Sequence, residues 1–354
     1  MSSIIVTIGP KSIDPNVIRK IKLAGADRFR INLSHSDEKS LKEYFEILSN
    51  EGITPAIDTQ GAQLRINNLC PQNNYEIGQF IEIRFSDGNE LKKEDKNIIC
   101  LNHKEAYPQI NIGDRLKVDF NGLALEVLSK ESDNLINTKV IASGKTEINK
   151  ALDVSNKNLN LSILTEFDKK AIDYAISRGC NEVYASFISN ANQVNEVRKQ
   201  INQNIRLISK IETSLGVANI EEILEVSDEI LIDRGDLSRE ISIASIPIAV
   251  FRIIELANKK NKPVNIATNV LDSMMNSSIP SRAEISDIYS NLSAGANGIV
   301  LAAEVAIGSN PISSTALLKY LIDLFNNHKN GLHGIGKVLK PKKELIGDEL
   351  FNWL

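Results

Sequence analysis

Short apolar runs alternate with helical segments along most of this 354-residue chain, and this alternation limits the possible folds more than any other feature. The first three runs are residues 4–7, 28–32 and 54–58. A helix is predicted between the first two, because Asp14-Pro15 is a strong helix start and Gly25 is a typical helix end. Strands separated by helices are usually parallel and joined by right-handed crossovers. The beginning of the chain is therefore predicted to form a βαβαβ unit.

The alternation stops between residues 66 and 154, where short strand-like runs are separated by turn residues. Examples are residues 80–85 before Ser86-Asp87-Gly88, and residues 116–119 before Asn121-Gly122. This pattern predicts a small β domain, residues 66–154, inserted after the third strand.

Helix and strand alternation then resumes. Thr165 is a predicted helix cap, and Ser281 with Glu284 forms a capping box before the last strand. The further strands are residues 182–186, 206–210, 229–233, 264–267 and 298–301. Eight strands, each followed by a helix, predict a closed (β/α)₈ TIM barrel from residues 1–65 and 155–328, with functional groups at the C-terminal strand ends. An open doubly wound sheet is the alternative, but no glycine-rich dinucleotide fingerprint follows the first strand.

Composition and the chain ends exclude several classes of protein. A net charge of -4 gives no electrostatic reason to expect nucleic acid or an anionic membrane as partner. No apolar stretch approaches the ~18 residues of a spanning helix, and no signal peptide is visible at the start. Three scattered cysteines without metal spacing indicate reduced thiols, so we expect a cytoplasmic protein. The tail, residues 329–354, ends in the apolar Phe351, Trp353 and Leu354, and is expected to pack on the barrel or on a second subunit.

Two strand ends in the middle of the chain carry opposite charges. Lys210 and Glu212 follow one apolar run, and Asp236 follows the next. Side chains two apart on a strand point the same way, so the first pair shares a face. One ammonium and two carboxylates suit a divalent metal such as Mg²⁺ with a phosphate beside it. For any one of these residues alone, a solvated ion pair or an acid in a loop is the simpler interpretation. Their occurrence at successive strand ends favours a functional site.

Polar side chains follow the other strands as well. The second and third strand ends carry Arg30, Asn32, Ser34, His35, Asp58, Thr59, Gln60 and Arg65. The later ones carry Arg234, Thr268, Asn269 and Glu304. The planar guanidinium of arginine can donate two parallel hydrogen bonds to a phosphate or a carboxylate, and lysine adds a movable positive charge. Such residues around a pair of acids suit a small anion that carries a phosphate and a carboxylate. The oxygens of Asn32, Ser34, Asp58 and Thr59 suit a monovalent cation, and Gly235 lets a backbone N–H approach a carboxylate closely.

From residue 4 to about residue 325 the chain resembles the pyruvate kinase family. The matching stretches include Thr7-Ile8-Gly9-Pro10, Arg30-Ile31-Asn32-Leu33-Ser34-His35, Asp58-Thr59-Gln60-Gly61, Ala185-Ser186-Phe187-Ile188, Ile208-Ser209-Lys210-Ile211-Glu212, Arg234-Gly235-Asp236-Leu237, Ala267-Thr268-Asn269-Val270-Leu271-Asp272-Ser273-Met274 and Ser281-Arg282-Ala283-Glu284. So many stretches in the family's order are very specific. The family's fold is a barrel with a β domain inserted after the third strand, which the chain pattern predicts independently.

The resemblance implies a role for each matching residue. Glu212 and Asp236 would bind Mg²⁺ or Mn²⁺, and Lys210 would neutralise the transferring phosphoryl group and the enolate. Arg30 would hold the phosphate, and Thr268 would hold the carboxylate together with the Gly235–Asp236 backbone. Arg65 and Arg234 are further substrate-binding candidates. The potassium ligands would be Asn32, Ser34, Asp58 and Thr59, and the nucleotide side would be Pro10, His35 and Lys150.

Several positions depart from the family pattern. Near the third strand and in the metal motifs the departures are Gln60 for Lys, Ala62 for Pro, Gln63 for Glu, Thr213 for Asn and Asp233 for Ala. At the last strand end, Ala302, Val305 and Ile307 replace two hydroxyls and an ammonium that help to deliver a proton to the enolate. Around Lys150 the residues 151–154 also differ. The metal and phosphoenolpyruvate half of the site is kept, and the acceptor and protonation half is changed.

Three functions follow as hypotheses. The leading one is a metal-dependent enzyme that transfers the phosphoryl group of phosphoenolpyruvate to ADP or another acceptor and releases pyruvate. The others are a lyase or synthase that uses the enolate for C–C bond chemistry, and a catalytically silent binding protein. The four charged residues Arg30, Lys210, Glu212 and Asp236 argue against silence, because clustered charges cost stability without a ligand. The match ends before the family's C-terminal domain, so we expect a monomer or homodimer.

Overall fold

The computed structural model describes residues 2–69, 74–85, 97–118, 122–131 and 134–329. They form two compact units: a barrel unit, Met1–Thr59 with Glu166–Leu354, and a second unit, Gln60–Thr165. The predicted boundaries at 65/66 and 154/155 fall inside the second unit. The tail beyond residue 329 and the predicted turns at 86–88 and 121 lie outside the described residues.

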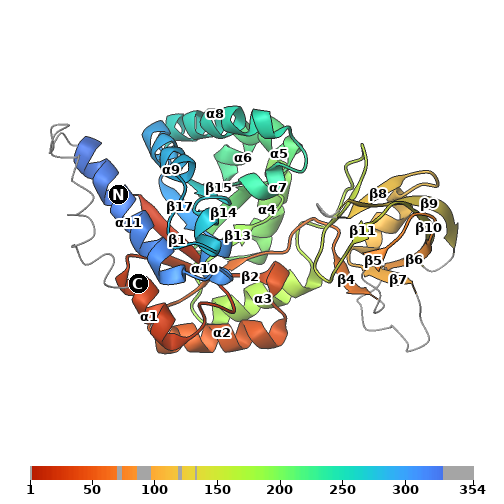
Figure 1. The fold of residues 1–354 in the computed structure, drawn as a ribbon, viewed down its shortest axis with the longest axis horizontal. Coiled ribbons are helices and arrows are strands. Elements are labelled where there is room, and N and C mark those ends of the chain that lie inside the picture. Colours follow the sequence, from red (N-terminus) through yellow and green to blue (C-terminus); the bar gives the residue numbers. More distant parts are fainter. Residues whose placement is uncertain (1, 70–73, 86–96, 119–121, 132–133, 330–354) are drawn as a thin grey trace. The chain divides into compact units, whose positions relative to one another are not determined.

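Eight parallel strands close a barrel in the first unit (Figure 1), which confirms the predicted (β/α)₈ fold. Around the barrel the order is β1-β17-β16-β15-β14-β13-β3-β2. Closure is made by β1, which pairs in parallel with both β17 and β2. The strands are β1 (Ser3–Ile8), β2 (Arg28–Asn32), β3 (Ala56–Asp58), β13 (Glu182–Ala185), β14 (Arg206–Ile211), β15 (Glu229–Asp233), β16 (Val264–Ala267) and β17 (Gly298–Leu301).

The helices of this unit follow the strands, as the alternation predicts. They are α1 (Pro15–Leu23), α2 (Glu38–Asn50), α3 (Glu166–Ser177), α4 (Ala191–Gln200), α5 (Ser214–Ala218), α6 (Ile220–Val226), α7 (Arg234–Leu237), α8 (Ile246–Lys259), α9 (Arg282–Ala294), α10 (Ala303–Ala306) and α11 (Pro311–Lys329), with short 3₁₀ turns at Leu33–His35, Ile243–Ser245 and Asp272–Met275. Two predicted caps are confirmed. Asp14 accepts hydrogen bonds from the first turn of α1, and Ser281 with Glu284 forms the capping box of α9.

A layer of inward-facing side chains fills the barrel. It consists of Ile5, Ala56, Tyr184, Ile208, Leu231, Ala267 and Val300, all 4% exposed or less. Burying apolar side chains of this kind is the main stabilising contribution of such a core. Because this layer closes the interior, the polar residues that follow the strands gather at the C-terminal end of the barrel.

The N-terminal end of the barrel is closed by an ion network around Arg28. Its Nε lies 2.7 Å from Glu182 Oε2, and its Nη1 lies 2.6 Å from Glu229 Oε1. Arg206 adds a 3.1 Å contact to Glu182. A pocket of about 300 Å³ opens beside this network, lined among others by Lys22, Arg28 and Glu182. In a barrel of this type, polar residues at this end stabilise the fold and the chemistry lies at the opposite end.

The second unit is built on antiparallel and parallel strands. Within the described residues its larger sheet has the order β12-β8-β9-β10-β6-β7-β4, and β5 (Asn74–Tyr75) pairs with β11 (Gly144–Lys145). The larger sheet contains β4 (Ile66–Leu69), β6 (Phe80–Phe85), β7 (Ile98–Leu101), β8 (Arg115–Val118), β9 (Leu123–Glu131), β10 (Leu135–Ala142) and β12 (Leu152–Val154), with a 3₁₀ helix at Lys104–Gln109. Its own apolar core includes Ile83, Leu116 and Ile136, none of them exposed. The predicted β insertion after the third barrel strand is therefore present.

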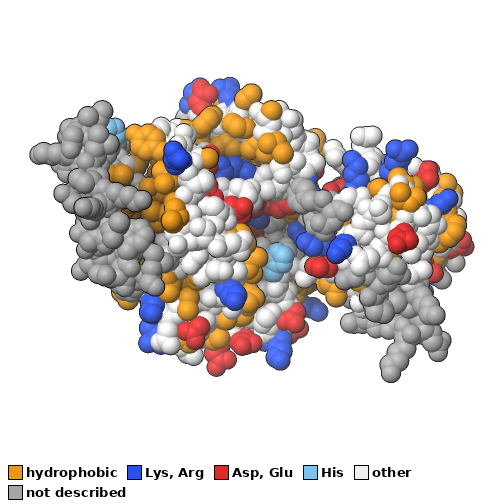
Figure 2. Space-filling view, viewed as in Figure 1, with side chains coloured by type: hydrophobic (Ala, Val, Ile, Leu, Met, Phe, Trp, Pro, Cys, Tyr) orange, Lys and Arg blue, Asp and Glu red, His pale blue; other side chains and the backbone are white. Residues whose placement is uncertain are grey.

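The surface of the barrel unit carries some large apolar side chains. Figure 2 shows hydrophobic side chains over α8, where Ile248 is 73% and Phe251 44% exposed. No helix among the described residues has the length and apolarity needed to cross a membrane. A monomer or homodimer remains a prediction.

Candidate active site

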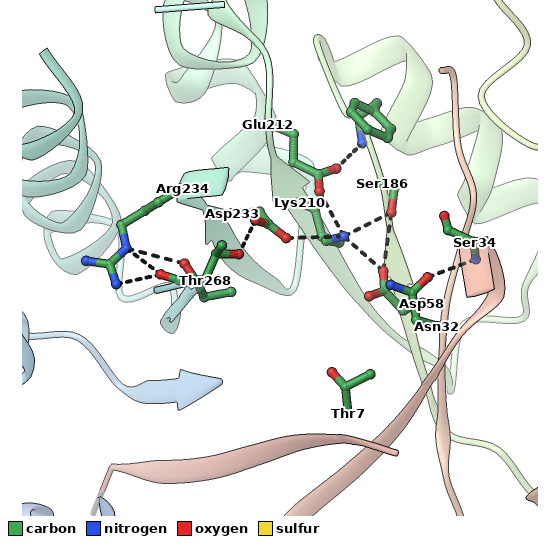
Figure 3. Close-up of polar contacts among 12 residues, drawn as sticks. Thr7, Asn32, Ser34, Asp58, Ser186, Lys210, Glu212, Asp233, Arg234 and Thr268 are labelled. Carbon is green, nitrogen blue, oxygen red and sulfur yellow. Dashed lines mark hydrogen bonds and ion pairs between the residues drawn. The ribbon is translucent and has the colours of Figure 1, made fainter. Parts of the chain in front are cut away.

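The ammonium group of Lys210 lies at the centre of the polar cluster at the C-terminal barrel end (Figure 3). Lys210 is on β14 and is 5% exposed. Its Nζ lies 2.8 Å from Glu212 Oε1, 3.1 Å from Asp58 Oδ1 and 3.7 Å from Asp233 Oδ2. It also donates a hydrogen bond of 3.2 Å to Ser186 Oγ. Burial alone would lower the pKa of Lys210, but the three carboxylates outweigh it and raise that pKa above its ordinary value.

Glu212 follows β14 and shares the face of Lys210, as the two-residue spacing predicts. Its Oε2 accepts a 2.7 Å hydrogen bond from the backbone N–H of Phe187. Burial raises the pKa of Glu212 to about 8; the Lys210 ammonium opposes this shift, and the Asp233 and Asp236 charges add to it. Burial is therefore the main reason why the Glu212 carboxyl holds its proton more strongly than an exposed glutamate does.

Three carboxylates meet at one point beside Lys210. Oxygens of Glu212, Asp233 and Asp236 lie within 4.8 Å of one another, and the first two residues are buried. Asp58 adds a fourth carboxyl group on the other side of Lys210, 3.1 Å from its Nζ. Carboxylate oxygens are the ligands that Mg²⁺ prefers, and it needs only one or two of them when substrate oxygens and waters complete the shell. The residues present therefore fit a divalent cation in donor type and in the convergence of their oxygens.

Asp58 links the metal cluster to Arg30. The Arg30 Nη1 lies 3.0 Å from Asp58 Oδ2, and its Nε donates a 2.8 Å hydrogen bond to Thr7 Oγ1. The guanidinium carbon also lies 5.4 Å from the centre of the Tyr184 ring. Arg30 is 2% exposed and Asp58 is fully buried, so removal of either would break a buried ion pair, which is strongly destabilising.

The predicted monovalent-cation residues lie at the ends of β2 and β3. Asn32 and Asp58 are direct neighbours in the strand register, and Asn32 Oδ1 accepts a 2.8 Å hydrogen bond from the Ser34 backbone N–H. The Thr59 carbonyl accepts a 2.7 Å hydrogen bond from Ser186 Oγ, and the Thr59 hydroxyl accepts one of 3.0 Å from the Ser186 N–H. Protein groups thus satisfy several of these oxygens, and the potassium assignment stays a prediction.

Arg234 organises the strand end next to the cluster. It donates to the carbonyl oxygens of Ala267, Thr268 and Asn269, and its Nη1 lies 2.6 Å from Asp287 Oδ2. Thr268 and Asn269 have φ values of 70° and 54°. Such a conformation is strained for a β-branched residue and persists only where the surroundings enforce it. The guanidinium therefore holds the loop that presents Thr268, in addition to any contact with a substrate.

The Thr268 hydroxyl donates a hydrogen bond to Asp233 Oδ1. Burial would raise the pKa of Asp233, but the Lys210 ammonium, the Thr268 hydroxyl, Arg30 and the Gly235 backbone N–H together lower it. Asp233 is therefore a charged member of the site.

Two residues of the cluster were not among the predicted site residues. Asp233 was visible only as a departure from the family pattern, and Ser186 only as part of a matching stretch. Each had a usable signal, because each is a polar residue at or just after the end of a barrel strand. Sequence position alone does not tell which of these side chains turns toward Lys210.

The remaining predicted residues are Pro10, His35, Arg65 and Lys150. Pro10 and His35 are exposed, after β1 and at the end of the Leu33–His35 turn. Arg65 and Lys150 belong to the second unit, where Arg65 Nη1 donates a 3.0 Å hydrogen bond to the Asn149 carbonyl. Arg65 and Lys150 are therefore residues of the second unit, and their part in binding stays a prediction.

The residues after β17 include a buried acid, Glu304. Ala302, Val305 and Ile307 stand there in place of the two hydroxyls and the ammonium of the family pattern. Glu304 is 2% exposed and accepts backbone hydrogen bonds from Val270, Leu271 and Ala302. Val305 is fully buried, whereas Ile307 is 55% exposed. Glu304 thus fixes the two loops after β16 and β17.

Comparisons with known proteins agree with this architecture. Residues 1–315 match the family model described as the pyruvate kinase barrel domain. Pyruvate kinase of Agrobacterium vitis is 32% identical over 334 residues, which are 93% of this chain and 70% of that protein. Pyruvate kinase of Candida albicans is 31% identical over 328 residues, which are 90% of this chain and 65% of that protein. The crystal structure of Cryptosporidium parvum pyruvate kinase is 26% identical with a TM-score of 0.81, over 90% of this chain and 69% of that one.

These relatives are longer than this chain, which spans 65% of the Candida albicans protein. The match nevertheless includes the whole barrel and the inserted β unit. The closed barrel, the family model over residues 1–315 and relatives above 30% identity lead to one conclusion. This chain belongs to the pyruvate kinase family.

Proposed function

We propose that this chain is a divalent-metal-dependent phosphotransferase of the pyruvate kinase type. It takes the phosphoryl group of phosphoenolpyruvate, passes it to ADP or another acceptor, and releases pyruvate. The observation that carries the proposal is the buried ammonium of Lys210, which lies 2.8 Å from Glu212 Oε1, together with the convergence of the Glu212 and Asp236 carboxylates. Phosphoryl transfer asks a protein mainly for positioning and charge compensation, and this cluster offers both.

Each residue has a distinct part in this proposal. Glu212 and Asp236 hold Mg²⁺ or Mn²⁺, which when bound supplies positive charge to the donor's oxygens. Lys210 compensates the charge of the transferring phosphoryl group. Arg30 holds the phosphate. Thr268, with the backbone at Gly235, holds the donor's carboxylate.

Further parts of the proposal rest on the family resemblance. A potassium ion is held by Asn32, Ser34, Asp58 and Thr59. The acceptor nucleotide lies near Pro10, His35 and Lys150, and Arg65 with Arg234 assists substrate binding. The protein works in the cytoplasm as a monomer or homodimer.

A second candidate function has one specific observation in its favour. At the end of β17 the side chains of Ala302, Val305 and Ile307 have no proton to donate. An enolate formed there has fewer donors nearby, and it would be available to attack a carbonyl compound. This lyase or synthase would use the same metal and the same Lys210.

Product analysis from labelled phosphoenolpyruvate separates the two functions. The protein is incubated with Mg²⁺ and K⁺, with ADP, with a panel of other phosphate acceptors, and with a panel of aldehydes and keto acids. Label on an acceptor together with free pyruvate supports the phosphotransferase. Free phosphate together with a longer carbon skeleton supports the synthase. Unchanged phosphoenolpyruvate under all conditions contradicts both.

A further inference from the structure

The side chain of Asp233 is surrounded by groups that bind anions. The Thr268 hydroxyl donates to its Oδ1, and Lys210 Nζ lies 3.7 Å from its Oδ2. Gly235 is close on another side, since a Cβ built on it would lie 3.5 Å from Asp233 Oδ1. Figure 3 shows the carboxylate between Lys210 and Thr268.

The same groups have another task under the proposed function. Thr268 and the Gly235 backbone are the groups assigned to the carboxylate of phosphoenolpyruvate. A Cβ on Gly235 would also lie 2.7 Å from Thr268 Cγ2, so these two residues pack too closely for a side chain between them. Two carboxylates cannot both accept the single hydroxyl hydrogen of Thr268.

We propose that Asp233 is a specificity-determining residue whose carboxylate fills the subsite for the donor's carboxylate. The inference rests on the proposed function. Phosphoenolpyruvate carries a carboxylate next to its phosphoester, so it must displace the Asp233 side chain or bind beside it. Two carboxylates in adjacent positions repel each other. A phosphate without that carboxylate meets no such competition. Asp233 therefore lowers the affinity for phosphoenolpyruvate selectively.

A different role for Asp233 makes the opposite prediction. Its oxygen lies within 4.8 Å of ligand atoms of Glu212 and Asp236, so it has the geometry of a third metal ligand. A metal ligand strengthens binding of the cation and of anything bound through the cation. A competitor for the carboxylate subsite weakens only the carboxylate-bearing ligand.

Titration calorimetry of the wild type and Asp233→Ala distinguishes the two roles. The probes are Mg²⁺ alone, then phosphoenolpyruvate and inorganic phosphate in the presence of Mg²⁺. We expect Asp233→Ala to bind phosphoenolpyruvate about tenfold more tightly or better, with phosphate and Mg²⁺ affinities within about twofold of the wild type. An unchanged or weaker affinity for phosphoenolpyruvate overturns the inference, and a parallel loss of Mg²⁺ affinity identifies a metal ligand instead.

Two further variants keep the test decisive. Asp233→Asn keeps the size of the side chain without its charge, so it carries the test if the alanine variant does not fold, with a smaller gain expected. Glu255→Gln removes an exposed carboxylate on α8 that pairs with Arg252 and Lys259, so it should leave the affinity for phosphoenolpyruvate unchanged. An equal gain in this control would show a general charge effect and overturn the inference. Tight wild-type binding without a gain in Asp233→Ala removes the inference alone, whereas no binding in any variant removes the proposed function with it.

Discussion

Lys210 and Glu212 point the same way at the end of β14, and Nζ of the first lies 2.8 Å from Oε1 of the second inside the barrel. The pair is buried and shares its surroundings with Asp58 and Asp233. Breaking a buried ion pair leaves a charge without compensation, which costs roughly 3–5 kcal/mol. Oxygens of Glu212, Asp233 and Asp236 converge beside this pair, and the first predictions concern a cation bound there.

Glu212→Gln and Asp236→Asn should each abolish Mg²⁺ binding that is measurable in the wild type. Each change removes a ligand charge at nearly constant size, so the far-ultraviolet circular dichroism should stay the same. Glu240→Gln is the matched control, because Glu240 is an exposed acid that accepts hydrogen bonds from Ser214. Calorimetry that finds normal Mg²⁺ affinity in both site variants would remove the acid pair from the metal site.

Lys210→Met should reduce kcat by about 10²- to 10³-fold and change the affinity for phosphoenolpyruvate far less, because Lys210 is assigned to the transferring group. Steady-state kinetics together with calorimetry separate these two effects. Lys210→Arg retains the charge and reports how much of the loss is due to position. Collapse of affinity with normal turnover of bound ligand would show that the assignment is wrong.

Pyruvate release should be slow in the wild type and faster after proton donors are restored at the end of β17. Ile307→Lys is compatible with the fold because Ile307 is 55% exposed, and Ala302→Ser adds a hydroxyl directly after β17. Val305 is left unchanged because it is fully buried, and a hydroxyl there would lack solvent. General acid help is worth about 10²–10⁴ in rate, so the double variant should gain at least about tenfold.

The measurement is a lactate dehydrogenase-coupled assay with Mg²⁺, K⁺ and ADP, with Ile307→Gln and unchanged Ala302 as the uncharged control. Wild-type pyruvate formation at a rate typical of a glycolytic enzyme would end this idea.

The second unit should lose stability in acid through Glu105. Burial would raise the pKa of Glu105, but hydrogen bonds from the Ser162 N–H and from His103 lower it to about 2. A depressed folded-state pKa stabilises the fold above the ordinary value of 4.5, and this stabilisation is lost as pH falls toward 2. Glu105→Gln should therefore be less stable than the wild type at pH 6, and the difference should shrink below pH 4.5. Urea unfolding at several pH values checks this, and a difference independent of pH would contradict it.

Much of the fold could be predicted from the sequence because the apolar runs and helix caps are local signals. All eight barrel strands follow from the alternation, and the α1 and α9 starts follow from Asp14 and Ser281. The limits of the inserted unit could not be predicted from the sequence in the same way. The first unit ends at Thr59, and the composition of the chain does not change there.

The candidate site was predictable in part for a similar reason. The two-residue period places Lys210 and Glu212 on one face without any knowledge of the fold. The contact of Asp233 with Lys210 and Thr268 brings together three different strand ends, and only the closed barrel fixes their distances. The strained φ of Thr268 and its support by Arg234 are likewise tertiary features.

If the metal and phosphoenolpyruvate half of the site is functional, the protein binds phosphoenolpyruvate only when a divalent cation is present. Calorimetric titration of phosphoenolpyruvate into the wild-type protein, in Mg²⁺ and again in EDTA, tests this most directly. We predict saturable binding in Mg²⁺ that disappears in EDTA and in Asp236→Asn. Binding of equal strength in Mg²⁺ and in EDTA, or no binding in either, would contradict the account.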